Sequence, residues 1–309
     1  MNMTYAPIAL FTYNRADKTK SVVESLLQNQ EAKDSDLFIF SDGPKTEAKA
    51  AGVDENRKYI HTISGFKSVT IIERDKNWGL ANSLIAGITN VIDQYGRVIV
   101  VEDDLVLSPY FLKFMNDGLE KYEDDDRVGT ICGYVFPFQK SLPDTFFLYF
   151  MHPWGWATWR RSWNLLDTDT KRLLRKMRFK TKKFNLGGNC GSYGNLYCQK
   201  VGLVDSWYIR FYASLFLNKK LNLFPGKTMV TNSGLDGSGT HCEKGLQKTN
   251  NFVLNPNPIE MKDIAVGESQ LAYSVFKSFY DVNAHISIFR KKIVDFKSFI
   301  RRALYIDCM

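Results

Sequence analysis

The sequence of 309 residues has no uninterrupted apolar run close to the roughly 20 residues that a membrane-spanning helix requires. Its first residues, MNMTYAPIALFTYNR, lack the basic and then apolar layout of a signal peptide, so we expect a cytoplasmic protein. The five cysteines include no C-x-x-C pair, and such an odd, scattered set is typical of reduced thiols. These absences argue against a disulfide-stapled fold and against a structural zinc site.

Familiar phosphate-binding and two-metal motifs are missing as well. The chain has neither a G-x-x-x-x-G-K-[ST] loop nor a G-x-G-x-x-G turn after its first apolar run, which argues against a P-loop or a dinucleotide-binding site. It has only four histidines, whereas nucleases and phosphatases usually gather several histidines and carboxylates around two metal ions.

The composition is that of an ordinary globular protein, with 44% hydrophobic and 24% charged residues. The net charge of +8 suits an anionic partner such as a phosphorylated small molecule, an anionic lipid or a nucleic acid. The excess lies in two basic clusters, residues 171–184 and 289–304, while the first 110 residues are nearer to balance. The chain has no recognised nucleic-acid-binding motif, so we expect no nucleic acid as a partner.

Short apolar runs alternate with helical patterns in the first third of the chain. This order predicts a largely parallel sheet that is covered by helices. After residue 110 the order is less regular, with a helix, further strands and a tryptophan-rich segment. The expected strands of the first third are residues 6–13, 36–42, 68–74 and 97–104.

Polar residues follow three of these strands, namely Asn14-Arg15, Ser41-Asp42 and Glu102-Asp103-Asp104. Ligands of parallel sheets bind beyond the carboxyl ends of the strands, so together these residues predict a site. Three neighbouring carboxylates repel one another and need a cation, and oxygen ligands suit Mg²⁺ or Mn²⁺. The alternation of a strand places Glu102 and Asp104 on one side and Asp103 on the other.

Six segments carry a resemblance to a known family: LFTYNR, FSDG, NWGLANS, VVEDDLVLSPYF, GWATWRRSW and VDSW. In this order the chain resembles a GT-A type glycosyltransferase, and more narrowly N-acetylglucosaminyltransferase I and its bacterial relatives, from about Ala6 to His241. The resemblance implies an α/β, Rossmann-like GT-A fold with a largely parallel central sheet flanked by helices and a C-terminal helical tail. It divides the chain into a nucleotide-sugar-binding half (1–108), an acceptor-binding and catalytic half (109–265) and the tail (266–309).

The resemblance also implies the donor and the cofactor, a nucleotide sugar that is usually linked to uridine diphosphate, and Mn²⁺ or Mg²⁺. By this resemblance Asp104 matches the family's metal ligand, while Asp103 would face the ribose and Glu102 would face the donor sugar. Arg15 and Asp42 match positions that contact the nucleotide base. The full set of donor-binding candidates is Thr12, Asn14, Arg15, Asp42, Asn77, Leu80, Asn82, Glu102, Asp103, Ser233 and His241.

On the acceptor side, the family's general base is an aspartate in a W-D-D-W sequence, and its counterpart here is Asp205 in VDSW. Asp205 would take the proton of the acceptor hydroxyl in an inverting transfer. The alternative is that Asp205 caps a helix, and Ser206 competes for that position. We expect His152 and Trp154 in the acceptor site. Trp156, Trp159 and Trp163 have helical spacing, and we expect two of these three in the core.

Residues 286–304 alternate apolar and basic side chains, which is the pattern of an amphipathic helix on an anionic membrane surface. We therefore expect a peripheral protein at the inner face of the membrane. The alternative is a helix that packs on the catalytic domain and leaves its basic face in water.

The sequence thus predicts a metal-dependent, inverting glycosyltransferase that moves a sugar from a nucleotide diphosphate donor to a glycan or lipid-linked acceptor in bacterial surface polysaccharide or lipopolysaccharide synthesis. Two alternatives stay open. A nucleotidyltransferase would share the sheet, the metal and the nucleotide, although LFTYNRAD lacks the glycine-rich signature that such enzymes normally carry. A non-catalytic lipid- or nucleic-acid-binding protein on a transferase-like fold would also suit the net charge.

Overall fold

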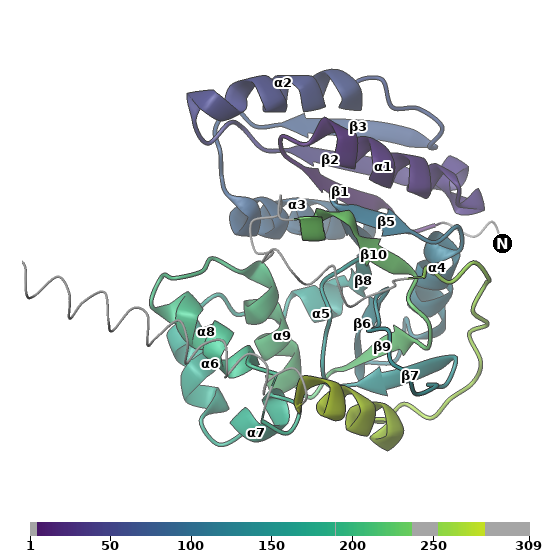
Figure 1. Cartoon of the computed structure of the whole chain (residues 1–309), viewed down its shortest axis with the longest axis vertical. Coiled ribbons are helices and arrows are strands. Elements are labelled where there is room, and N and C mark those ends of the chain that lie inside the picture. Colours follow the sequence, from purple (N-terminus) through teal and green to yellow (C-terminus); the bar gives the residue numbers. More distant parts are fainter. Residues whose placement is uncertain (1–4, 189, 237–252, 282–309) are drawn as a thin grey trace, which may run out of the picture.

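The computed structural model describes residues 5–188, 190–236 and 253–281 (Figure 1). Its main sheet consists of β1 (Ile8–Thr12), β2 (Asp36–Ser41), β3 (Ser68–Glu73), β4 (Arg97–Glu102), β6 (Val128–Cys132), β7 (Thr145–Leu148), β8 (Trp156–Trp159) and β9 (Leu221–Pro225). These strands lie in the order β3-β2-β1-β4-β8-β6-β9-β7. Two short strands, β5 (Leu105–Leu107) and β10 (Val230–Asn232), form a separate antiparallel pair.

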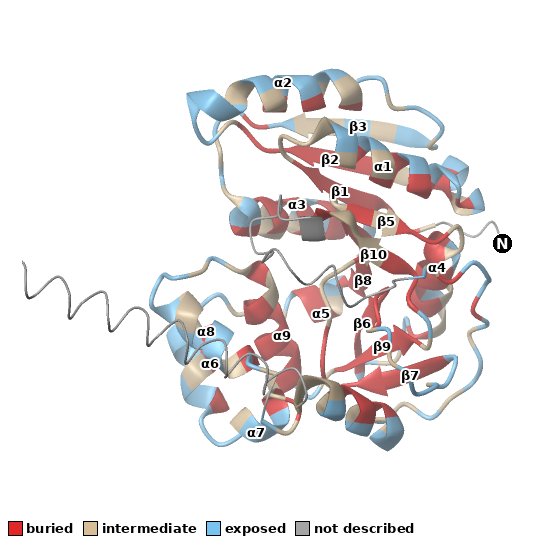
Figure 2. Ribbon diagram, viewed as in Figure 1, coloured by how far each residue is buried: buried red, intermediate tan, exposed pale blue. Residues whose placement is uncertain are grey.

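Helices cover both faces of the main sheet, which confirms the predicted α/β fold. One face carries a core that includes side chains of α3 and α9, and the other face carries a core with side chains of α1 and α4 (Figure 2). The helices are α1 (Ala16–Leu27), α2 (Glu47–Ile60), α3 (Leu80–Tyr95), α4 (Phe111–Lys121), α5 (Arg160–Trp163), α6 (Thr170–Met177), α7 (Thr181–Phe184), α8 (Ser192–Lys200) and α9 (Trp207–Leu217), with two 3₁₀ turns, η1 (Gln30–Asp34) and η2 (Ser233–Asp236).

The first four strands are parallel, in the order β3-β2-β1-β4, as the alternating pattern predicts. All five residues of β1 are buried, and so are the central residues of β4. Continuous apolar runs of this kind are typical of parallel strands with helices on both faces. β3 lies at the edge of the sheet, and it alone among these four has mostly half-buried and exposed residues.

The second half of the sheet differs from the prediction at the tryptophan-rich segment. Trp156 and Trp159 do not lie on a helix but in β8, which runs antiparallel between β4 and β6. Residues three apart on a strand point to opposite faces, and these two rings accordingly belong to the two different cores. Two of the three tryptophans were expected in the core, and the structure buries all three, because Trp163 is buried as well.

The predicted C-terminal tail is described only in part. Residues 270–281 form a helix whose Phe276 packs against Phe146 and Phe224 of the sheet. The segment 286–304, for which we expect membrane binding, lies outside the described residues. In the part of the chain that is described, no helix is both long and apolar enough to cross a membrane.

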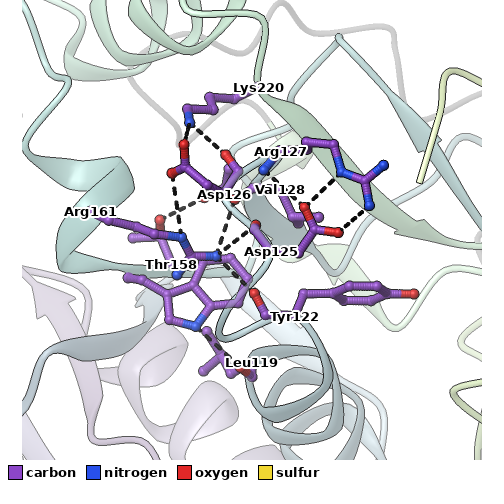
Figure 3. A network of polar contacts seen from close by, with 11 residues as sticks. Leu119, Tyr122, Asp125, Asp126, Arg127, Val128, Thr158, Arg161 and Lys220 are labelled. Carbon is purple, nitrogen blue, oxygen red and sulfur yellow. Dashed lines mark hydrogen bonds and ion pairs between the residues drawn. The ribbon is translucent and has the colours of Figure 1, made fainter.

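A network of polar contacts joins the turn after α4 to β8 and to the start of β9 (Figure 3). The Arg161 guanidinium donates to the carbonyl oxygens of Tyr122 (2.8 Å) and Asp125 (3.2 Å) and lies 4.0 Å from the centre of the Trp159 ring. Lys220 Nζ forms an ion pair with Asp126 at 2.9 Å. Arg161, at the start of α5, is thereby a half-buried cation that holds the chain between α4 and β6 in place.

Replacing Arg161 should therefore destabilise the fold. We expect Arg161→Met to lower the free energy of unfolding by about 1–3 kcal/mol, because two carbonyl groups lose a charged, half-buried donor. Arg127→Met is the matched control, since the Arg127 side chain is 64% exposed and its ion pair with Asp125 should contribute little. Chemical denaturation checks both variants, and equal losses in the two would contradict the role of Arg161.

Candidate functional site

Three strand ends meet at one edge of the sheet. Thr12 of β1 lies opposite Ser41 of β2, and Phe11 of β1 lies opposite Glu102 of β4. The polar residues that follow these strands therefore share the carboxyl edge of the parallel half, as the sequence predicts.

The amino end of β8 lies at the same edge, because Trp156 pairs with Val100 of the antiparallel neighbour β4. The start of α9 lies beside it, since the Trp207 ring stacks on the Trp156 ring with centroids 5.2 Å apart. Tyr208 Oη also donates to the carbonyl oxygen of Met151 at 2.8 Å. This end of the sheet thus gathers the donor-side and the acceptor-side candidates.

The Arg15 guanidinium lies between two carboxylates of the acid triplet. Arg15 Nη2 forms a very short ion pair with Asp103 Oδ1 and a second pair with Asp104 Oδ2 at 3.2 Å. The contact spans 88 residues of sequence and brings the loop after β1 against the end of β4. Arg15 is the cation that the crowded acids require in the metal-free protein.

The prediction that Glu102 and Asp104 share one side, with Asp103 opposite, is wrong. β4 ends at Glu102, and Asp103 and Asp104 lie in the turn that leads to β5. The two-residue alternation of a strand does not extend into a turn. Asp103 and Asp104 consequently face the same guanidinium.

Burial sets the protonation of these acids. It raises the pKa of Glu102 to about 8, and the charges of Asp104 and Asp103 add to the rise. Burial also raises the pKa of Asp103 to about 6, although the Arg15 charge opposes this shift. The same carboxylates raise the pKa of Arg15, which stays protonated at every accessible pH.

The chain after β10 closes over Asp104. Ser233 donates to the Asp104 carbonyl oxygen from its backbone N–H (2.7 Å) and from its hydroxyl (3.1 Å). The carbonyl oxygen of Ser233 in turn accepts from Lys18 Nζ at 2.8 Å. A Cβ atom at Gly234 would come within 2.7 Å of Asp104 Oδ2, so only glycine leaves this carboxylate accessible here. His241, a donor-site candidate, lies outside the described residues.

The donor set around Asp104 fits a hard cation that takes most of its ligands from a substrate. Asp103 Oδ2 is buried and, within the described residues, has no hydrogen-bond partner. Arg15 already occupies the position of a positive charge between Asp103 and Asp104. Among the described residues, no group of three or more His, Cys, Asp or Glu side chains could hold a metal ion without further ligands. Mg²⁺ commonly uses one or two carboxylates together with substrate phosphate oxygens, which suits this arrangement.

Asp42 lies one strand further along the edge and fixes the loop before α3. Its carboxylate accepts from the backbone N–H groups of Trp78 (2.9 Å) and Gly79 (3.0 Å). Asn77 assists by donating to the Gly43 carbonyl oxygen at 2.8 Å. Asp42 is buried, so a ligand would meet it together with the loop that it holds.

Two residues beside Asp42 were not predicted. The Arg74 guanidinium lies 4.0 Å from the centre of the Trp78 ring, and half of the Trp78 surface is exposed to solvent. Arg74 directly follows β3, so the strand-end argument that found Asp42 could have found it too. An exposed aromatic ring over a cation offers a flat surface at this edge.

The other donor-side candidates lie around this edge without contacting the acids. Thr12 Oγ1 is buried and accepts from Asn56 Nδ2 of α2 at 3.1 Å. Asn14 is half-buried at the end of β1, while Leu80 and Asn82 are exposed on the first turn of α3.

The acceptor-side candidates His152 and Trp154 lie together with a residue that was not predicted, Tyr134. The ring centroids of Tyr134 and His152 are 4.3 Å apart, and those of Tyr134 and Trp154 are 4.6 Å apart. Burial lowers the pKa of His152 to about 3, so its imidazole is neutral near pH 7. His152 Nδ1 accepts from the Trp154 N–H at 3.4 Å, which leaves its other ring nitrogen as the proton carrier.

Asp205 is not the helix cap, because Ser206 is the N-cap of α9 and accepts from the Ile209 N–H. The Asp205 side chain is 57% exposed and forms an ion pair with Arg210 at 3.0 Å. Gln199 of α8 also donates to Asp205 Oδ1 at 3.4 Å. Asp205 is therefore an accessible carboxylate that α8 and α9 hold in position.

The raised pKa values predict that the free energy of unfolding of the metal-free protein falls as the pH rises from about 4 to about 8. As the pH rises through this range, the unfolded chain gives up both protons early, whereas the folded chain keeps the proton of Asp103 up to about pH 6 and that of Glu102 up to about pH 8. Glu102→Gln should reduce the loss in the free energy of unfolding between pH 4 and pH 8 by on the order of a few kcal/mol, since glutamine has no proton to lose. Denaturation at pH 5, 6.5 and 8 checks this, and equal pH profiles for both proteins would contradict it.

A family model and two solved structures were found to be similar to this chain. Residues 8–194 match the family model described as glycosyl transferase family 2. No curated protein sequence matches the chain. A mannosyltransferase, PcManGT from Pyrobaculum calidifontis in complex with GDP-Man and Mn²⁺, is 13% identical, with a TM-score of 0.39 over 70% of each chain. S. aureus TarS 1-349 is also 13% identical, with a TM-score of 0.43 over 75% of this chain and 62% of that one. Because the family model covers more than half of its length, the chain belongs to glycosyl transferase family 2 and is a glycosyltransferase of the GT-A fold.

Proposed function

We propose that this glycosyltransferase is metal-dependent and inverting, and that its donor is a sugar linked to uridine diphosphate. The observation that carries the proposal is the cluster of Arg15, Asp103 and Asp104 at the carboxyl edge of the sheet. The resemblance to N-acetylglucosaminyltransferase I and its bacterial relatives supports uridine as the base. On this proposal Asp42, with the loop that it holds, meets the base, and Asp103 meets the ribose.

Asp104 is the protein's ligand to Mn²⁺ or Mg²⁺ in this proposal, with the remaining positions left to the diphosphate and water. When bound, the ion stabilises the negative charge that builds up on the departing diphosphate. Arg15 already touches both carboxylates and can turn one of its N–H groups toward a phosphate oxygen. Glu102, which burial keeps protonated near pH 7, can donate to a hydroxyl of the donor sugar.

On the acceptor side, Asp205 takes the proton of the attacking hydroxyl group. Two observations support this role: the Asp205 side chain is exposed, and its contacts with Arg210 and Gln199 fix its orientation. A general base must reach its substrate in such a fixed orientation. His152 and Trp154, with Tyr134, provide an aromatic surface for the acceptor sugar.

We further propose that the acceptor is a glycan or a lipid-linked glycan in bacterial surface polysaccharide or lipopolysaccharide synthesis. Residues 1–108 would bind the donor, residues 109–265 the acceptor, and residues 266–309 would form the tail. The expected binding of residues 286–304 to the inner face of the membrane belongs to this proposal.

The metal role predicts that Asp104→Asn weakens the Mn²⁺-dependent binding of uridine diphosphate about tenfold or more, because the amide is a much poorer ligand for a hard cation. Asp124→Asn, in the exposed turn after α4, is the matched control and should bind as the wild type does. Titration calorimetry with and without Mn²⁺ measures the change. Unaltered affinity in Asp104→Asn would rule out the metal role.

The base role predicts that Asp205→Asn lowers kcat by about 10²–10⁴ and leaves donor affinity unchanged. Ser206→Ala separates this effect from helix capping, because it removes the cap at a stability cost of about 1 kcal/mol and keeps the carboxylate. Steady-state kinetics and thermal melting of both variants test the assignment. A similar kcat in Asp205→Asn and the wild type would refute it.

A further inference from the structure

The surface formed by residues 170–184 combines a concentration of positive charge with an exposed aromatic ring. It comprises α6, α7 and the turn that joins them, and it contains eight Lys or Arg residues and no acid. We refer to it as the α6–α7 surface. Its cations have no part in the donor site or the acceptor site described above.

The α6 helix presents its charges outward because its apolar side chains point inward. Leu173 and Met177, four residues apart, are buried against the domain. Its Lys and Arg side chains are exposed, and so are the basic residues that follow on the turn and on α7 (Figure 2). The exposed cations are Lys171, Arg172, Arg175, Lys176, Arg178, Lys180, Lys182 and Lys183.

Within the described residues, ion pairs neutralise two of these eight cations. Arg172 pairs with Asp167 at 2.5 Å, and Lys183 pairs with Glu268 at 3.2 Å. For the other six, the part of the chain that is described offers no acid within ion-pair distance. Like charges packed this closely repel one another, so an anionic partner would relieve the repulsion.

Phe179 lies in the middle of this charge, on the turn between α6 and α7. Its surface is 90% exposed, the highest value among the large apolar side chains of the described residues. The Arg178 guanidinium lies 5.3 Å from the centre of its ring. A solvent-exposed aromatic ring adds little to the stability of the folded protein. An exposed ring beside Lys and Arg is typical of segments that enter the headgroup layer of a membrane.

This surface is connected to the acceptor side of the protein. The helix α6 packs against α8 and α9, and these two helices hold Asp205 through Gln199 and Arg210. A surface anchored by α6 and α7 would therefore stay in a fixed relation to the acceptor site (Figure 1).

We propose that the α6–α7 surface docks the protein on an anionic lipid bilayer, with Phe179 inserted among the headgroups and the surrounding cations facing lipid phosphates. The charge alone would suit any anionic polymer, and the exposed ring favours a bilayer, because only a bilayer offers an apolar layer beneath its charge. The inference is independent of the metal, the donor and the tail segment 286–304.

The test measures flotation of the full chain with vesicles of phosphatidylglycerol and phosphatidylcholine, and with phosphatidylcholine alone. We expect binding only to the anionic vesicles. Phe179→Ser should lower the partition coefficient about tenfold, and Lys176→Glu combined with Lys180→Glu should lower it about tenfold or more. Both changes fall on exposed side chains, so the variants should melt at the wild-type temperature.

Matched controls alter the same residue types elsewhere. Val253 is 78% exposed, and Val253→Ser should bind vesicles as the wild type does. Lys49→Glu combined with Lys58→Glu reverses two exposed charges on α2 and should have a much smaller effect.

Hydrogen exchange separates this surface from any contribution of the tail, because it resolves segments of the chain. We expect slower exchange in residues 171–184 when anionic vesicles are added. Unchanged exchange in that segment, or equal flotation of Phe179→Ser and the wild type, would overturn the proposal. Binding to soluble polyphosphate that Phe179→Ser leaves intact, without vesicle binding, would also overturn it and identify an anionic polymer as the partner.

Discussion

The ion pair between Arg15 and the acids after β4 is the interaction on which the site depends. Three carboxylates at the end of a buried strand would repel one another and lower stability without a neighbouring positive charge. Arg15 supplies that charge from the loop after β1, so the neighbouring strands β1 and β4 are joined at their carboxyl ends. The same arrangement leaves Asp104 accessible beside Gly234, where a cation and a diphosphate would replace part of this contact.

Around this centre, each neighbouring element holds one functional group in place. Asp42 fixes the loop before α3 through backbone N–H groups, and Ser233 ties the chain after β10 to Asp104. On the other side, Ser206 caps α9 while Arg210 orients Asp205. The proposed donor side is built on parallel strands, whereas the proposed acceptor side depends on the antiparallel strand β8 and the helices behind it.

The sequence predicted the parallel half well because its strands are continuous apolar runs that end in polar residues. It did not predict the contact of Arg15 with Asp103, which joins residues 88 positions apart, since no local pattern reports such a distance. The helical spacing of Trp156 and Trp159 was misleading, because two buried faces of one strand can produce the same spacing as one buried face of a helix. The choice between Asp205 and Ser206 as the cap needed backbone geometry, since both residue types favour that position.

The central claim is that the acids near position 103 hold a divalent cation that in turn holds a nucleoside diphosphate. Titration of the unmodified full chain with uridine diphosphate, in the presence of Mn²⁺ and in the presence of a chelator, tests it most directly. The account predicts affinity about tenfold or more higher with Mn²⁺, because the ion joins the diphosphate to Asp104. Equal affinity in the two conditions would contradict the account.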